Sequence, residues 1–458
     1  MADEQLNKGQ RNLQIDDLKI VSLDGNEENL EEFYTEIRIF ESIFLPTLTA
    51  DIVIVDPKNI MEELPIVGGE TVHMKLRTST FPDDPGACIQ RSFNVTAITQ
   101  RGLDNDRQQV YTLKLVSPEM VRDSGHTLNR AMPGPGGDTN TEALAKKIFD
   151  DFVKVEGRYL PDDDENELVI SGSPHKSSIQ YISNSWTPFT NLNYICKRIQ
   201  AADVNGSDFF FFESNKSYYL TSLQHLIQEG KNSYFEEYTY KPSSLPKNIR
   251  EEGSYSGISL PDYFSAIETM EIPRTISILD GNLSGYYSSN IQAYDMFNKK
   301  FKNFHLDIHE DFGSLETTDE NIPIPKGISK SPSAYTSVKL LNSYTWNGPE
   351  QSQGVNDDAL TTHWSSDAVR KQYINSFKDY QFLIMVPGRT DIEVGRCIKM
   401  NYPKPASKSS GDEYTEDEIL SGLYVVTEIK HKINAANYDM TMRITKNGVG
   451  KSLGGSYE

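Results

Sequence analysis

Apolar and polar residues alternate with a period of two along several stretches of this 458-residue chain. This pattern is typical of β-strands that bury one face. The clearest example runs from residue 33 to 55, where Ile37 and Ile39 alternate with charged neighbours and the link 44–47 joins two strands as a hairpin. The same alternation predicts further strands at 71–78, 93–99, 109–116, 396–402, 423–430 and 438–444, and a hairpin of 209–212 with 218–223.

Residues 119–206 follow a helical spacing instead. Leu144, Ile148 and Phe152 recur every four residues after the capping signal 139–142, and Thr187-Pro188 opens a second amphipathic stretch. The segment is therefore predicted to be mainly helical.

Two segments far apart in the chain share one pattern. The first begins at Gly68-Gly69 and the second at Gly395, and apolar residues follow at matching spacings over three successive strands. In the first strand Val72, Met74 and Leu76 match Ile398, Met400 and Tyr402; in the second Phe93, Val95 and Ile98 match Tyr424, Val426 and Ile429; in the third Tyr111, Leu113 and Leu115 match Tyr438, Met440 and Met442. Any two antiparallel meanders alternate in this way, but three strands in one order after a shared glycine favour a duplication.

The repeat predicts an α+β, β-dominated fold with two antiparallel β-barrel or sandwich modules, a helical segment between them and a large mixed insertion. Each module is expected to begin with a hairpin and a short helical turn, at 33–64 and at 209–228. The predicted domains are a first β module at 1–118, a helical segment at 119–206, a discontinuous second β module at 207–239 and 383–450, an insertion at 240–382 and a flexible tail at 451–458.

Charge and composition exclude several functional classes. The chain carries 45 Lys and Arg against 66 Asp and Glu, a formal charge of −21, so specific nucleic-acid binding and anionic membrane surfaces are disfavoured. Its apolar runs are too short for membrane insertion, and the first residues show no secretion signal. Cys88, Cys196 and Cys397 lie too far apart in sequence for a disulfide framework, which suggests a protein made and folded in a reducing cytoplasm.

The sequence marks out no catalytic, cofactor-binding or metal-binding residues. His305, Asp307 and His309 would share one face of a strand, but their side chains diverge, and a solvated strand face is the better interpretation. The acidic loop 162–167 lacks the glycine and glutamate of a calcium-binding loop, and the glycine-rich stretch 133–137 follows no strand that could aim a phosphate loop. A pair of carboxylates for glycoside hydrolysis stays possible, because only the fold could bring such a pair together.

Several motifs, in their order along the chain, resemble those of one family. They are Asp56-Pro57, Leu64-Pro65-Ile66-Val67-Gly68-Gly69-Glu70, Ser117-Pro118-Glu119, Trp186-Thr187-Pro188-Phe189, Phe210-Phe211-Phe212-Glu213, Tyr218-Tyr219-Leu220-Thr221-Ser222-Leu223, Ser284-Gly285-Tyr286-Tyr287, Tyr294-Asp295, Val386-Pro387-Gly388, Val394-Gly395, Ser421-Gly422-Leu423-Tyr424-Val425-Val426 and Thr427-Glu428-Ile429-Lys430-His431. With these motifs the chain resembles the central baseplate hub protein of contractile-tailed, T-even-like bacteriophages.

The resemblance implies a non-enzymatic structural protein of the virion, made late in the host bacterial cytoplasm. It implies a homotrimer in which two tube-like modules per chain form a pseudo-six-fold ring between the six-fold tail tube and a three-fold spike. The implied partners are other copies of the chain, the spike protein, tail-tube or tube-initiator proteins, and tape-measure and baseplate wedge proteins. The chain is longer than the compact members of the family, and the loop 403–421 is expected to be a peripheral elaboration.

Two points stay open at this stage. An acidic ring bore would let DNA slide through without sticking, but the acidity could equally serve solubility alone. The rival functions are a tail-associated cell-wall hydrolase that uses carboxylates of the insertion, and a carbohydrate-binding adhesin, suggested by the 10% aromatic content.

Overall fold

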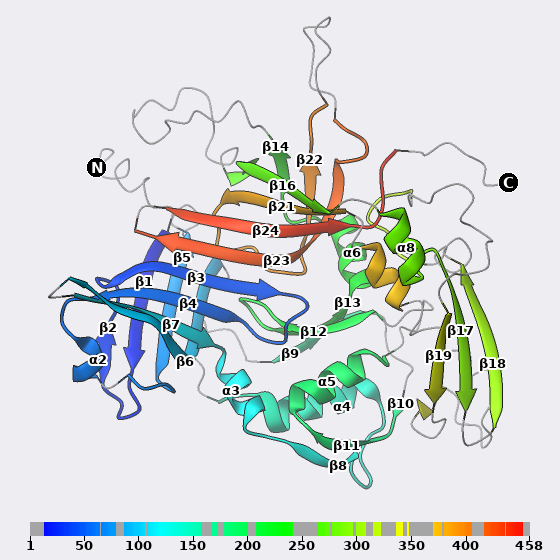
Figure 1. Ribbon diagram of the computed structural model, residues 1–458, viewed down its shortest axis with the longest axis horizontal. Helices are drawn as coiled ribbons and strands as arrows, with labels where there is room; N and C mark the ends of the chain where they lie inside the picture. Colours follow the sequence, from blue (N-terminus) through cyan, green and yellow to red (C-terminus); the bar gives the residue numbers. More distant parts are fainter. Residues whose placement is uncertain are drawn as a thin grey trace, which may run out of the picture.

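A 14-stranded sheet dominates the computed structural model of the chain (Figure 1). The structure describes residues 13–64, 66–78, 87–105, 108–156, 159, 167–172, 178–199, 208–240, 264–274, 277–295, 299–307, 315–321, 336–341, 346–347, 370–377, 380–404, 416–435 and 437–451. The β-dominated class predicted from alternation is confirmed.

The first half of the sheet is built from the N-terminal strands. They run in the spatial order β3-β4-β7-β6-β5-β1-β2 and enclose a core of apolar side chains that includes Ile37, Ile52 and Phe93. Their bounds, with the short helix that follows β4, are β1 (Leu13–Val21), β2 (Glu27–Asn29), β3 (Tyr34–Ser42), β4 (Thr49–Asp56), α2 (Ile60–Glu63), β5 (Thr71–Thr78), β6 (Cys88–Asn105) and β7 (Gln108–Val116).

The second half repeats this path with strands from later in the chain. Its order is β16-β21-β24-β23-β22-β14-β15, so β16, β21, β22, β23 and β24 take the places of β3, β4, β5, β6 and β7. The strands are β14 (Glu237–Tyr240), β15 (Ala266–Ile267), β16 (Thr269–Arg274), β21 (Tyr380–Pro387), β22 (Cys397–Asn401), β23 (Gly422–Asn434) and β24 (Tyr438–Lys446). The two outermost strands differ in direction, because β14 is parallel to β22 whereas β1 is antiparallel to β5.

The two halves contain equivalent backbone hydrogen bonds as well as equivalent strands. The N–H of Gly69 donates to the carbonyl of Val95 at 2.7 Å, and the N–H of Gly395 donates to the carbonyl of Val426 at 2.8 Å. Both glycines have positive φ, at 102° and 87°, a conformation that disfavours residues with a side chain. The duplication that the sequence pattern favours is therefore also present in the strand order and the backbone hydrogen bonds.

A β-bulge follows the glycine contact in each half. The register of β6 against β7 shifts around Thr96, and that of β23 against β24 shifts around Thr427. The Oγ1 of each threonine donates to a carbonyl of the neighbouring strand at 3.1 Å, that of Lys114 or that of Arg443. This shared bulge fixes which residues of the two halves are equivalent.

The bulge corrects one sequence-based match. Leu115 lies opposite Val95, and Ile444 lies opposite Val426, so Leu115 is equivalent to Ile444 and not to Met442. The predicted match of the third strand is wrong by two residues. A shift of two keeps every side chain on the same face of a strand, so alternation could not reveal it.

The hairpin predicted to begin the second module, at 209–228, does not belong to the large sheet. β12 (Phe209–Glu213) and β13 (Tyr218–Ser222) pair with β9 (Leu168–Ile170) in a separate three-stranded sheet. The hairpin equivalent to β3 and β4 is β16 and β21, which the chain connects through the insertion. β15 and β16, predicted to belong to the insertion at 240–382, thus pair into the large sheet, while the bounds of the five predicted domains stay predictions.

The segment between the halves has its own apolar core, lined by Phe149, Phe189, Phe211 and Tyr218. Its elements are α3 (Pro118–Ser124), β8 (Leu128–Met132), α4 (Thr141–Ile148), a π-helical turn (Phe149–Val153), β9, β10 (Ser178–Ile179), β11 (Tyr181–Trp186), α5 (Pro188–Cys196), β12, β13 and α6 (Leu223–Asn232). The helices predicted for 119–206 are present, together with short strands. α6 packs against β22 and belongs to the core of the second half.

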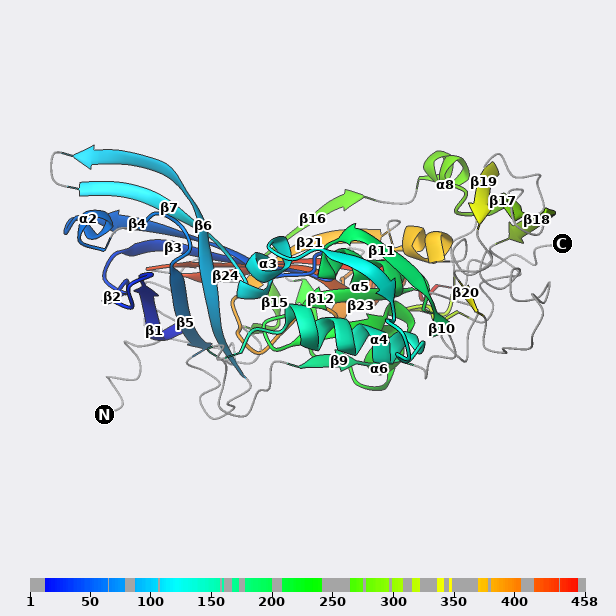
Figure 2. The same ribbon diagram turned by 90° about the horizontal axis from the view of Figure 1, so that it is seen from below.

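The insertion lies at the far end of the molecule from β6 and β7 (Figures 1 and 2). Its described elements are α8 (Ile278–Ser284), β17 (Ser288–Asp295), β18 (Lys300–Asp307), β19 (Thr336–Leu341), β20 (Trp346–Asn347) and the helical residues 370–376. β17, β18 and β19 form a small sheet of their own. In the described part of the chain, no helix is both long and apolar enough to cross a membrane.

The paired glycines give a first test. We expect Gly69→Ala and Gly395→Ala each to lower the free energy of unfolding by roughly 1–2 kcal/mol, because alanine is strained at positive φ. Gly134→Ala is the matched control, since a Cβ there meets nothing within 4 Å and its φ is not positive. Urea denaturation followed by tryptophan fluorescence measures the difference, and equal stability of all three variants would contradict the assigned role.

Candidate functional site

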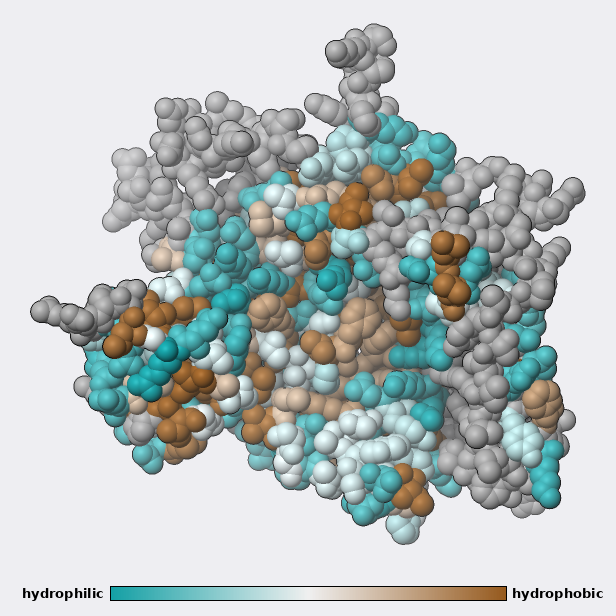
Figure 3. Space-filling model, in the orientation of Figure 1, coloured by the Kyte–Doolittle hydropathy of each residue, from teal (hydrophilic) through white to brown (hydrophobic). Residues whose placement is uncertain are grey.

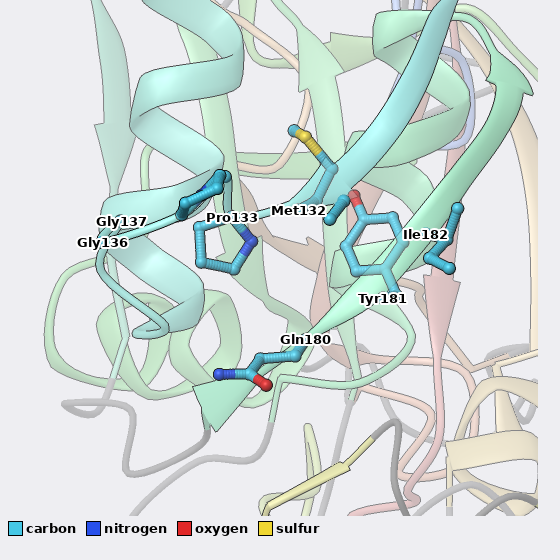
Figure 4. Close-up of a pocket in the computed structure, with 10 residues that line it drawn as sticks. Met132, Pro133, Gly136, Gly137, Gln180, Tyr181 and Ile182 are labelled. Carbon is cyan, nitrogen blue, oxygen red and sulfur yellow. The ribbon is translucent and has the colours of Figure 1, made fainter.

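The hollow beside the glycine-rich turn 133–137 offers no catalytic group. It measures about 460 Å³ and lies between that turn and β11 (Figure 4). Its lining contains no acid, base, serine or cysteine, and its tyrosine, Tyr181, is engaged through a 2.9 Å hydrogen bond from its hydroxyl to Asn191. Burial raises the pKa of Tyr181, so this hydroxyl is a poor acid or base near neutral pH.

A second hollow, of about 280 Å³, lies between α6 and the start of β22 and contains the thiol of Cys397. Burial raises the pKa of Cys397 to about 12, so the thiol stays protonated at physiological pH. Its Sγ donates to the carbonyl of Leu226 at 3.3 Å. The thiol is a packing group here and not a nucleophile.

His305, Asp307 and His309, the weak metal-binding candidate of the sequence, form no metal site in the described part of the chain. His305 is exposed on β18, Asp307 is buried on the same strand, and His309 lies outside the described residues. Most of the acidic loop 162–167 also lies outside them. Within the described ranges, no three His, Cys, Asp or Glu side chains come together in a way that could hold a metal ion.

The most extensive contact between the two halves is the junction at which one strand of each half pairs with the other and joins them into one sheet. β23 of the second half pairs antiparallel with β3 of the first half, from Glu428 opposite Ser42 to Asn434 opposite Glu36. Figure 1 shows the two strands side by side, although almost 400 residues separate them in sequence. The pairing produces a continuous antiparallel run of eight strands, β16-β21-β24-β23-β3-β4-β7-β6.

Three polar side chains are sealed inside this junction. Nε2 of His431 lies 3.1 Å from Oε1 of Glu41, and both side chains are fully buried. Nδ1 of His431 lies 2.9 Å from the hydroxyl of Tyr438, which donates to the carbonyl of Arg389 at 2.8 Å. The N–H of Asn215 donates to the second carboxylate oxygen of Glu41. Burial, helped by the charges of Glu41 and Asp391, raises the pKa of Tyr438 and keeps it a neutral donor.

The number of available protons determines which atom donates in each hydrogen bond of this cluster. The single hydroxyl proton of Tyr438 goes to the carbonyl of Arg389, so Nδ1 of His431 must donate to the tyrosine oxygen. Nε2 and Oε1 of Glu41 can then hydrogen-bond only if a second proton lies between them. This buried hydrogen bond links the two halves independently of the backbone.

Other buried contacts hold the first half against the segment between the halves and against the second half. The carboxylate of Glu213 accepts from the N–H of Leu48 at 2.9 Å and from the hydroxyl of Ser117 at 2.5 Å. The hydroxyls of Thr78 and Thr390 lie 2.9 Å apart. The Thr78–Thr390 contact therefore joins the two halves in addition to the β3–β23 junction.

The face of the eight-strand run that points away from the cores is called the open face below. It carries pairs of opposite charges at ion-pair distance, and the side chains are between about one tenth and one half exposed. Lys114 lies 2.8 Å from Asp51, Arg38 lies 2.9 Å from Glu36, and Arg443 lies 3.0 Å from Glu428. Lys430 and Lys432 add further positive charge between these pairs. The acidity of the chain is therefore not concentrated on this face.

Exposed apolar side chains occur in several places of the described chain, and one group lies on the insertion. Figure 3 shows a brown patch where α8 lies, and Leu279 and Leu283, one helical turn apart, are 76% and 73% exposed. Further exposed apolar residues occur on the two outer strands of the eight-strand run, namely Leu103 on β6 and Ile272 on β16.

The sequence interpretation missed the polar cluster of the junction. The sequence did contain a sign of this cluster, because it places two polar residues at core positions. Glu41 continues the buried series of Ile37 and Ile39, and His431 lies between Ile429 and Ile433 on the buried face of its strand. A charged residue at a core position needs a buried partner, but alternation does not say which strand supplies it.

Comparison with solved structures identifies the fold. The chain is similar to the tail protein from Neisseria meningitidis MC58, with a TM-score of 0.51 and 10% identity over 94% of this chain and 97% of that one. It is also similar to the 43 kDa tail protein of prophage MuSo2 from Shewanella oneidensis (TM-score 0.49, 8% identity, 94% and 98% covered) and to prophage tail protein gp18 from Listeria monocytogenes (TM-score 0.44, 8% identity, 93% and 94% covered). The first similarity shows a tail-protein fold over nearly the whole chain. The fold assignment rests on this similarity, because the other two have TM-scores below 0.5.

Sequence comparison adds nothing to this. No protein-family model matches the chain, and no curated protein matches it.

The buried cluster predicts strong coupling between the two halves. Glu41→Leu and His431→Leu should each lower the free energy of unfolding by roughly 3 kcal/mol or more, because each leaves a buried polar partner unsatisfied. The double variant should lose clearly less than the sum, since an apolar pair can fill the site. Guanidinium unfolding of the four proteins measures the cycle, and additive losses would contradict a direct Glu41–His431 interaction.

Proposed function

We propose that the chain is a structural protein of a phage tail and forms the trimeric central hub of its baseplate. Three copies close into a ring of six equivalent half-sheets that joins a six-fold tail tube to a three-fold spike. The tail-protein fold and the resemblance of the sequence motifs to baseplate hubs both support this assignment.

One observation carries the proposal: the same strand path occurs twice in one chain, joined side by side in one sheet. Two equivalent units per chain give three copies the angular repeat of a hexamer while the exact symmetry stays three-fold. Such a chain suits a position between a six-fold and a three-fold structure. We further propose that the insertion runs between β16 and β21, and that it elaborates the outside of the ring.

The open face is proposed to line the channel of the ring. Its side chains are partly exposed, whereas the opposite face is sealed by the apolar cores. Lys114, Arg38 and Arg443 each pair with an acid, and Lys430 and Lys432 add positive charge, so these side chains give the wall no excess of acidic groups. The idea of a strongly acidic bore therefore gains no support from the described residues.

The proposed partners are further copies of the chain, a spike protein below, tail-tube or tube-initiator proteins above, and tape-measure and wedge proteins nearby. The protein would act in the virion after synthesis in the host cytoplasm. The description of a contractile tail and of late synthesis rests on the sequence resemblance alone.

The two rival functions have weaker support. A hydrolase needs a placed acid and base, and neither hollow described above offers that pair. An adhesin needs exposed aromatic platforms, but Trp186 packs between Tyr181 and Tyr194, with ring centroids 6.0 Å and 4.9 Å away. The side chains of Trp346 and Trp364 lie outside the described part of the chain.

The mass of the purified protein tests the proposal. Light scattering and native mass spectrometry should give three times the chain mass of 51.8 kDa, alone or with a spike protein present. A stable monomer at tens of micromolar, even with spike protein added, would contradict the hub assignment. Clearing of a peptidoglycan gel by the isolated chain would favour the hydrolase instead.

A further inference from the structure

The small sheet of the insertion, at one end of the molecule, turns one face toward solvent (Figures 1 and 2). β17 pairs with β18 along its whole length, from Ser288 opposite Asp307 to Asp295 opposite Lys300, and β19 pairs with its other edge. Ile291 of β17 is buried and belongs to the core of the second half. Successive side chains of a strand point to opposite faces, so the residues that alternate with Ile291 lie on the outer face.

Two aromatic residues lie directly opposite each other on this outer face. Tyr294 of β17 is the register partner of Phe301 of β18, so the two side chains share one face. Tyr294 is 38% exposed and Phe301 is 60% exposed. Single exposed aromatic residues are common on protein surfaces, but an exposed cross-strand pair places two uncovered rings in one small area.

The rest of the outer face carries neutral amides and an imidazole. Gln292 lies opposite Asn303, and Asn290 lies opposite His305. Asn303 and His305 are exposed, whereas Asn290 and Gln292 are half-buried. Asp307, the next residue of β18 on this face, is buried. The exposed part of the face therefore carries no carboxylate, ammonium or guanidinium group among the described side chains, unlike the open face of the large sheet with its ion pairs.

We propose that this surface is a binding site for a neutral polysaccharide. It is called the insertion face below and consists of Asn290, Gln292, Tyr294, Phe301, Asn303 and His305. The proposal goes beyond the hub assignment and does not depend on the ring.

The chemistry of the insertion face matches that of a sugar chain. A sugar ring has an apolar C–H side that packs on an aromatic ring, and Tyr294 and Phe301 offer two such rings. Its hydroxyl groups both donate and accept hydrogen bonds, as the side-chain amides of Gln292 and Asn303 also do. A neutral ligand leaves no charge to be compensated, and the exposed side chains of the face supply none.

The same features disfavour a nucleic acid. Bases also stack on exposed rings, but such sites carry Lys and Arg that neutralise the phosphates. The exposed side chains described on the insertion face include neither, and Lys299 lies outside it, in the turn before β18.

The length of the face suits a chain of sugars. Asn290 and Tyr294 are four residues apart on β17, which is about 13 Å at the rise of a strand. The aromatic pair lies at one end of this length and the Asn290–His305 pair at the other. Successive sugars of one polysaccharide would therefore contact the rings and then the amides.

Substitutions in the full-length chain test the site. On an array of purified neutral and acidic bacterial polysaccharides, the wild type should bind at least one neutral polysaccharide, whose affinity is then measured by biolayer interferometry. Tyr294→Ala and Phe301→Ala should each weaken this binding roughly fivefold, because each removes a ring, and Asn303→Ala should weaken it about threefold. Tyr234→Ala is the matched control, since Tyr234 is 43% exposed and lies outside the insertion, and it should leave the affinity unchanged.

Hydrogen exchange locates the site without any substitution. Addition of the bound polysaccharide should slow the exchange of the β17 and β18 amides and leave that of the β3–β23 junction unchanged. Binding to no polysaccharide, binding to acidic ones alone, or equal losses in Tyr294→Ala and Tyr234→Ala would overturn the proposed site. Binding of a single-stranded oligonucleotide that Tyr294→Ala abolishes would also overturn it, in favour of a nucleic acid. None of these results changes the mass of the assembly, which tests the hub assignment separately.

Discussion

The backbone pairing of β23 with β3 is the contact on which the architecture depends. It converts two compact β units, separated by more than a hundred residues of helix and loop, into one continuous sheet. Backbone hydrogen bonds fix the direction and spacing of the two halves, and the buried Glu41–His431 bond fixes their register. A polar pair in such a place is costly to bury, but it disfavours every register in which the two side chains would not meet.

The chain also shows how two copies of a duplicated unit can diverge. Two equivalent units in one polypeptide need not stay identical, and here they differ in the connection between corresponding strands. The first unit keeps a short link between β3 and β4, whereas the second places the whole insertion between the corresponding strands, β16 and β21. The common sheet is preserved because the added residues enter at a hairpin end and not within a strand.

Alternation along the sequence was enough to predict β3 to β7 and β22 to β24, the fold class and the duplication, because burial of one face imposes a period of two. It could not place the Phe209–Ser222 hairpin, since the pattern of a half-buried hairpin is the same whether its partner is β9 or a strand of the large sheet. It also missed the two-residue offset between Leu115 and Ile444, which leaves the pattern unchanged. The partner of Glu41 lies 390 residues away, and only the tertiary structure brings it close.

The position of the insertion has a mechanical consequence. Its two ends continue directly into β16 and β21, so a load applied to the insertion passes into the terminal strand of the sheet before it reaches either core. β16 contains Pro273 near its end, and fewer residues pair it with β21 than pair β21 with β24. A protein that pulled on the insertion would therefore detach β16 from β21 before it disturbed the core of either half.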